Sequence, residues 1–170
     1  MKYYKVKPLE VGICHLGKDH VLGDDYSEDD RISFALYAVL VQGEGVNVLV
    51  DLGPETLEYT NNMFQRYGFF RKTDGVKEYP DDLVQKNGNV FDRLRDEGVA
   101  PEEIDYLIFS HLHADHHGMD NAKNPGAAAH FPNTTLIASG RGWQANLDRR
   151  VNGQWNSYVD FAFGDYLKEM

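Results

Sequence analysis

The amino-acid sequence predicts an α/β (α+β) fold, and three observations lead to this prediction. The first third of the 170 residues is rich in apolar, β-branched and aromatic runs that are typical of strands. Apolar residues with helical spacing follow at 81–97, and a buried strand is expected at about 105–110. Because no repeat, low-complexity tract or Pro/Gly/Ser-rich linker divides the sequence, residues 1–170 are expected to form a single domain.

The strands at the beginning of the sequence are expected to include a hairpin. The run "YYKVKPLEVGICHL" at 3–16 is typical of a broken strand, and "ISFALYAVLVQ" at 32–42 of a strong one. The tripeptide "GEG" then turns the chain into "VNVLVDLG" at 46–53. Apolar and polar residues alternate in this last run well enough for it to pair with 32–42 as a hairpin.

The middle and end of the sequence add helices and two further strands. Gly98 is well placed to cap the end of the helix expected over 81–97. The apolar residues expected on one side of that helix are Val90, Phe91 and Leu94, with Leu83 and Val84 as additions. The segments that follow are a proline-led turn before the strand at 105–110, a strand "TTLIAS" at 134–139 and a helix "GWQANLDRR" at 142–150.

Composition and charge exclude several classes of protein. Seventeen basic and 27 acidic residues give a net charge of −10, which argues against nucleic acid or an anionic membrane as the main partner. Cys14 is the one cysteine, so neither an intramolecular disulfide nor a cysteine-based zinc cluster can form. No signal-peptide pattern and no apolar run near 20 residues is present, and the default expectation is a soluble cytoplasmic protein.

The segment "HLHADHH" at 111–117 carries the chemistry. It holds four of the seven histidines and follows the apolar run "YLIFS", so it is expected at the C-terminal end of a strand, where α/β folds often bind ligands. Imidazole and carboxylate suit zinc, and also iron or manganese. His111 and His113 can hold one ion, while Asp115 and His116 can reach a second. The alternative is a surface loop that binds metal only adventitiously, as a histidine tag does.

The pattern His-x-His-x-Asp-His, preceded by a strand and by "VLVDLG", resembles the metallo-β-lactamase superfamily. The resemblance implies an αββα sandwich with a dinuclear site, expected to hold two zinc ions, on one edge. It also implies a hydrolase in which a metal-bridging hydroxide attacks the substrate. Carried over to this sequence, His111 and His113 would bind the first metal, and Asp115 and His116 the second. Asp115 would in addition shuttle a proton to the leaving group.

The resemblance also concerns His117 at the end of the motif segment and Asp51 upstream of it. His117 stands where many relatives have a small residue, and it is expected behind the metal ligands or exposed to solvent. Asp51 in "VDLG" matches a position that supports the metal loop through hydrogen bonds. A turn-forming aspartate ahead of Gly53 is the alternative for Asp51.

Within the superfamily the outline is most like the N-acyl homoserine lactonase branch, with other ester and thioester hydrolases as neighbours. The substrate would then be a small lactone or related ester. An aromatic group in the middle of the sequence could form a wall for an acyl chain, although aromatic residues at helical spacing are more often core. These residues are Phe64, Tyr67, Phe69, Phe70 and Tyr79.

The second half of the family pattern is missing from the sequence. A third histidine, a bridging aspartate and a last histidine normally follow, but the one later histidine, His130, matches no family ligand. Asp148, Asp160 and Asp165 are in no recognisable bridging motif. We therefore expect the N-terminal half of the domain, truncated at its C-terminal side. Its uncovered apolar faces would favour self-association or a complementary C-terminal half. The alternative function is a catalytically incomplete half-domain that binds metal weakly or acts only in protein interaction.

Overall fold

The computed structural model describes residues 3–23, 25–26, 30–54, 71–73, 76–78, 84–85, 88–118 and 130–151. Its strands are β1 (Lys5–Gly17), β2 (Arg31–Gly43), β3 (Val46–Val50), β4 (Arg71–Thr73), β5 (Val76–Glu78), β6 (Val84–Gln85), β7 (Tyr106–Ile108) and β8 (Thr135–Ile137). Its helices are α1 (Lys18–Leu22), α3 (Val90–Asp96), a 3₁₀ turn (Pro101–Glu103), α4 (Ala114–His117) and α5 (Gly140–Val151).

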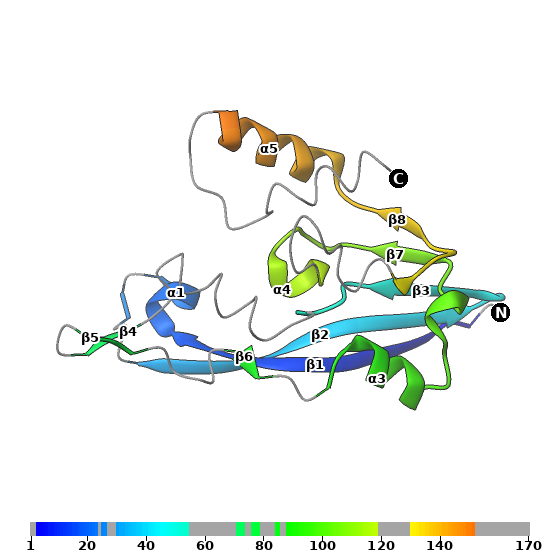
Figure 1. The fold of residues 1–170 in the computed structure, drawn as a ribbon, viewed down its shortest axis with the longest axis horizontal. Helices are drawn as coiled ribbons and strands as arrows, with labels where there is room; N and C mark the ends of the chain where they lie inside the picture. Colours follow the sequence, from blue (N-terminus) through cyan, green and yellow to red (C-terminus); the bar gives the residue numbers. More distant parts are fainter. Residues whose placement is uncertain are drawn as a thin grey trace.

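Six strands form one mixed sheet in the order β6-β1-β2-β3-β7-β8, and β4 and β5 pair separately (Figure 1). Strand β2 is antiparallel to both of its neighbours, β1 and β3, whereas β3, β7 and β8 run parallel. The parallel arrangement places the ends of β3 and β7 at the same edge of the sheet. The mixed sheet with few helices confirms the predicted fold class.

The predicted hairpin forms with a two-residue turn. Glu44 and Gly45 both have positive φ, 54° and 78°, which matches the twist of the strands that they join. Gly98 also has the left-handed φ, 72°, that ends a helix. Strand β1 is continuous where a broken strand was expected, and it carries a register shift between Glu10 and Gly12.

The prediction of one helix over 81–97 is wrong for its first part. Val84 pairs with Cys14 of β1, so it belongs to a strand at the edge of the sheet. Gly88 has φ +103°, and Asn89 then caps α3 through its side chain, which accepts a hydrogen bond from the Asp92 backbone N–H. The helix therefore begins at Val90. Leu83 lies outside the described residues.

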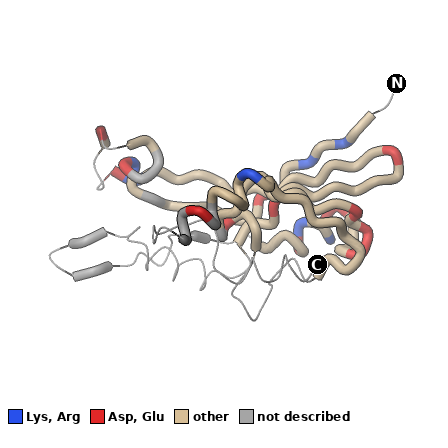
Figure 2. The backbone as a smooth tube through the Cα atoms, turned by 90° about the horizontal axis from the view of Figure 1, so that it is seen from above, with Lys and Arg blue, Asp and Glu red and all other residues tan. Residues whose placement is uncertain are grey.

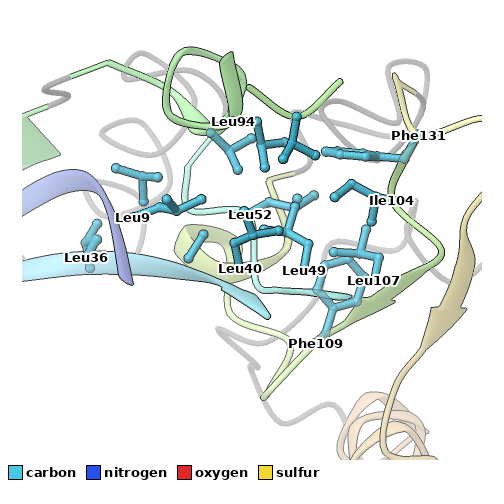
Figure 3. Packing of buried hydrophobic residues seen from close by; sticks show 14 of the residues in the cluster. Leu9, Leu36, Leu40, Leu49, Leu52, Leu94, Ile104, Leu107, Phe109 and Phe131 are labelled. Atoms are coloured by element: carbon cyan, nitrogen blue, oxygen red, sulfur yellow. The ribbon is translucent and has the colours of Figure 1, made fainter. Parts of the chain in front are cut away.

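One face of the sheet carries the core. Leu40, Leu49 and Leu107 stand next to one another on β2, β3 and β7, and Val90 and Leu94 of α3 are buried in the same cluster (Figure 3). The helix is fixed to β1 from its polar side as well. Lys5 and Lys7 both pair with Glu97, at 3.0 Å and 2.8 Å, just after the last turn of α3.

The opposite face of the sheet is apolar but only partly covered. The strand register places Val6, Val41, Val48 and Tyr106 in one row across four strands. The next row is Pro8, Val39, Val50, Ile108 and Ile137. In Figure 2 the long hairpin strands carry few charged residues along their middle. Val6 is 62% exposed and Ile137 41%, which is unusual for apolar residues in such rows. Self-association through this face stays a prediction.

Among the described residues, no helix is both long enough and apolar enough to span a bilayer.

Candidate metal centre

The histidine-rich segment follows β7 at the edge where β3 also ends. Asp51 N–H donates to Ile108 O at 2.9 Å, and Leu52 N–H donates to His116 O at 2.7 Å. Gly53 and His117 form a further isolated bridge. The turn after β3 is thus fastened by backbone contacts to the segment after β7. This places residues about 60 positions apart in sequence at one site.

The segment was predicted to be a loop, and the structure differs in its second half. Ser110–His113 are irregular, but Ala114–His117 form a single helical turn, α4. The N–H groups of His116 and His117 donate to His113 O at 3.0 Å and 3.1 Å. Gly118, with φ 64°, then ends the turn in the left-handed conformation that glycine allows.

The side chains of His111, His113 and His116 converge, as predicted. His111 Nε2 lies 2.9 Å from His113 Nδ1, and the His111 and His116 ring centroids are 3.9 Å apart. Asp115 Oδ2 is 3.7 Å from His116 Nε2. The donor atoms therefore come together as two pairs, His111 with His113 and Asp115 with His116.

Asp51 supports this cluster through hydrogen bonds. It is also a turn-forming aspartate ahead of Gly53, the other role considered for it. Its φ is 58°, which aspartate tolerates better than most residues. Its Oδ1 accepts the Ser110 backbone N–H at 2.8 Å, and its Oδ2 accepts the Ser110 hydroxyl at 2.5 Å and His116 Nδ1 at 2.9 Å. Burial would raise the pKa of this carboxyl, but the hydrogen bonds from His116 and Ser110 outweigh burial and lower it.

The pKa of His116 is shifted in the opposite direction from the pKa values of His111 and His113. Burial would lower the pKa of His116, but the hydrogen bond to Asp51 and the charge of Asp115 raise it. Burial lowers the pKa of His111 and of His113, although the Asp115 carboxylate opposes the shift. The lowered pKa values favour the neutral forms of His111 and His113, in which imidazole can bind a metal.

The side chains of the cluster are of the types that bind a divalent metal, but too few of them are grouped to hold one ion. His116 gives one ring nitrogen to Asp51 and turns the other toward Asp115, the arrangement usual for a metal-binding histidine. Across the part of the chain that the structure describes, however, no three His, Cys, Asp or Glu side chains are grouped so that they could hold one ion. Catalytic zinc usually has three protein ligands. Each pair thus supplies part of a coordination shell.

The other predicted site residues fall in different places. His117 is not exposed but buried, with 1% of its surface accessible. His130 is exposed and its ring lies edge-on to Phe91, 5.3 Å away. Asp148 is on α5, where it accepts a hydrogen bond from Gln144. Asp160, Asp165 and the side chains of the aromatic group, Phe64, Tyr67, Phe69, Phe70 and Tyr79, lie outside the described residues.

Sequence reasoning missed Ser110, which contacts both Asp51 and His111. The only available signal was a small hydroxyl residue between the buried strand and the first histidine. That signal is weak, because serine is common wherever a strand ends.

The chain belongs to the metallo-beta-lactamase superfamily, whose sequence profile matches residues 34–119. It is 26% identical over 138 residues to an N-acyl homoserine lactonase of Bacillus cereus, covering 81% of this chain and 49% of the relative. The chain therefore spans about half the length of that relative.

Solved structures show the same fold. A Bacillus thuringiensis AiiA variant with N-decanoyl-L-homoserine bound matches with a TM-score of 0.62 and 22% identity, covering 94% of this chain and 55% of that one. A probable metal-dependent hydrolase from Staphylococcus aureus matches with a TM-score of 0.58 and 15% identity, covering 95% and 57%. At these identities the likeness concerns the fold. It confirms the predicted fold class, and the match covers little more than half of each of these two chains.

The burial of His117 leads to a prediction about acid stability. Burial and the neighbouring His116, His113 and His111 lower the pKa of His117 from 6.5 to about 3, and the opposing charge of Asp51 does not prevent this. Below pH 6.5 the unfolded chain binds a proton at this residue that the folded chain does not, so stability falls as the pH falls. Between pH 7 and pH 5 the loss from this one group is about 2 kcal/mol.

We expect His117→Leu to remove this part of the pH dependence in the metal-free chain. Urea unfolding at pH 7 and pH 5 measures it, because the other histidines contribute equally to both proteins. His130→Leu serves as the matched control, because it makes the same replacement at a histidine that is exposed. A His117→Leu protein that still loses as much stability as the wild type on acidification would contradict the assignment.

Proposed function

We propose that this sequence is the motif-bearing half of a metal-dependent hydrolase that opens a lactone or a related ester. The observation that carries the proposal is the convergence of His111, His113 and His116 beside Asp115, within the superfamily's motif. The similarity to an N-acyl homoserine lactonase favours an acyl homoserine lactone as the substrate class.

Each described residue has a place in this proposal. His111 and His113 would hold one ion, and Asp115 and His116 a second, with zinc as the expected metal and iron or manganese as alternatives. Such ions, when bound, acidify water and polarise the substrate carbonyl. Asp115 would take up the proton of the attacking water and deliver it to the leaving alkoxide, so that the ring-opened product leaves neutral at that oxygen.

An incomplete half-domain remains the second candidate function, because the described donors form two pairs rather than a full set. The two candidates differ in their metal content. A complete dinuclear site holds two ions tightly per chain, whereas two separate pairs hold them loosely.

The experiment compares the 170-residue chain with the longest natural polypeptide that contains it. For each we would measure zinc per chain, mass in solution and turnover of N-decanoyl homoserine lactone. We expect the 170-residue chain to bind zinc weakly, to self-associate and to turn over little lactone, and the longer polypeptide to hold two ions and to be active.

Two results would contradict parts of the proposal. A monomeric 170-residue chain with two tightly bound ions and robust turnover would show that it completes the site by itself. A longer polypeptide that hydrolyses β-lactams or phosphodiesters but no lactone would place the protein in another branch of the superfamily.

A further inference from the structure

Ser110 occupies the junction between β7 and the first histidine of the motif, and its hydroxyl touches two groups. Its Oγ is 2.5 Å from Asp51 Oδ2 and 3.1 Å from His111 Nδ1. Its backbone N–H also donates to Asp51 Oδ1, at 2.8 Å. The serine is therefore held at one carboxylate by both its main chain and its side chain.

The direction of these hydrogen bonds follows from the chemistry of the groups. An ionised carboxylate only accepts hydrogen bonds, so the Ser110 hydroxyl must donate its one proton to Asp51. The hydroxyl then has only lone pairs left to offer to His111. Nδ1 of His111 must in turn carry a proton in order to donate to the serine oxygen, and Nε2 of the same neutral ring is left with its lone pair.

The lone pair of His111 points to the place where a metal would be bound. Its Nε2 faces His113 Nδ1 at 2.9 Å. Asp51 also accepts the Nδ1 proton of His116 at 2.9 Å, and this frees His116 Nε2 on the side of Asp115. One carboxylate thus orients two histidines, His116 directly and His111 through a serine.

We propose that Ser110 is a positioning residue that relays Asp51 to His111 and fixes His111 in the Nδ1-protonated tautomer, with Nε2 ready to bind metal. This inference rests on the proposed metal centre for its purpose, but the tautomer itself is a property of the metal-free chain. The two can therefore be tested separately.

The first measurement is the tautomer of His111 in the metal-free, ¹⁵N-labelled chain at pH 7.5, read from two-bond ¹H–¹⁵N correlations of the imidazole rings. We expect protonated Nδ1 and unprotonated Nε2 at His111 in the wild type. In Ser110→Ala the backbone hydrogen bond to Asp51 remains but the hydroxyl is lost, so His111 should shift toward the Nε2-protonated form. Ser110→Thr keeps a hydroxyl and should restore the wild-type pattern.

The second measurement is zinc affinity by competition with a chromophoric chelator. Removing a hydrogen-bonding partner of a metal ligand typically weakens metal binding by about 10- to 100-fold. We expect a loss of this size in Ser110→Ala and recovery in Ser110→Thr.

The chain offers a matched control in a second serine–histidine pair. Ser33 Oγ lies 2.6 Å from His15 Nδ1, in the antiparallel register of β1 and β2. Ser33→Ala should alter the imidazole signals of His15 while leaving the His111 tautomer and the zinc affinity unchanged. Equal losses of zinc affinity in Ser33→Ala and Ser110→Ala would overturn the inference, because the effect would then be a general one.

The remaining outcomes separate the inference from the proposed function. An Nε2-protonated His111 in the wild type overturns the serine relay. This measurement needs no variant, so it does not depend on whether a variant folds. An unchanged tautomer and affinity in Ser110→Ala also overturns it. A tautomer that depends on Ser110, together with no zinc binding by the longest natural polypeptide that contains this sequence, supports the relay and contradicts the metal centre.

Discussion

Replacing Asp115 with asparagine is expected to reduce lactone turnover by about 10²- to 10⁴-fold, the usual contribution of a positioned proton-transfer group. The side chain of Asp115 is only 14% exposed, and its carboxylate faces His116. Its negative charge also acts on His113 and on the buried Cys14, whose pKa burial and this charge raise to about 12. Asparagine keeps the shape of the side chain but can neither carry the charge nor take up a proton.

Steady-state turnover of N-decanoyl homoserine lactone by the longest natural polypeptide containing this sequence measures the effect. Zinc content should fall as well, because Asp115 is assigned to the second ion and a neutral amide is the weaker ligand. Asp96→Asn, on the exposed side of α3, removes a charge at a distance from the cluster and should leave turnover and zinc unchanged. Near-normal turnover in Asp115→Asn would show that the residue has no catalytic role.

The second large effect is expected for Gly53→Ala, which should destabilise the chain by about 2–5 kcal/mol. Gly53 has φ +71°, and a left-handed backbone costs about 1–2 kcal/mol for a residue with a Cβ. A Cβ at this position would also overlap the Val11 side chain, since its Cγ2 would be 2.2 Å away. Overpacking of a buried position typically costs a further 1–3 kcal/mol or so.

Gly45→Ala separates the two causes. Gly45 has a similar φ, +78°, but nothing lies within 4 Å of the position that its Cβ would take. Urea unfolding should therefore give a loss of about 1–2 kcal/mol for Gly45→Ala, the cost of the backbone conformation alone. The Gly53 variant should in addition lose zinc, because Gly53 pairs with His117 and its neighbour Leu52 binds His116 O. Equal unfolding free energies for the two variants would mean that Val11 moves aside without cost.

Local patterns account for the parts of the fold that could be predicted from the sequence. The hairpin followed from the alternation of 32–42 and 46–53 around "GEG", and the end of α3 from Gly98, because turns and caps depend on residues close in sequence. The convergence of His111, His113 and His116 was predictable for the same reason, since the three residues belong to one short segment.

The parts that failed depend on contacts between distant residues. Val84 has the spacing of a helix residue, but its partner is Cys14, 70 positions earlier, and no local pattern reveals that pairing. Burial of His117 likewise depends on the turn after β3, through its bridge to Gly53. The role of Ser110 depends on its hydrogen bond to Asp51, which lies 59 residues earlier in the sequence.

The separation between Asp51 and its partners also has a consequence for how the chain folds. The β2–β3 hairpin closes across two residues, whereas the hydrogen bonds of Asp51 to Ser110 and His116 span 59 and 65 residues. Contacts of high sequence separation form late, because the entropy of closing a long loop must be met before they contribute. The hairpin is thus expected to appear early and the histidine cluster to assemble last. Far-ultraviolet circular dichroism would then recover during refolding before the imidazole signals reach their native positions.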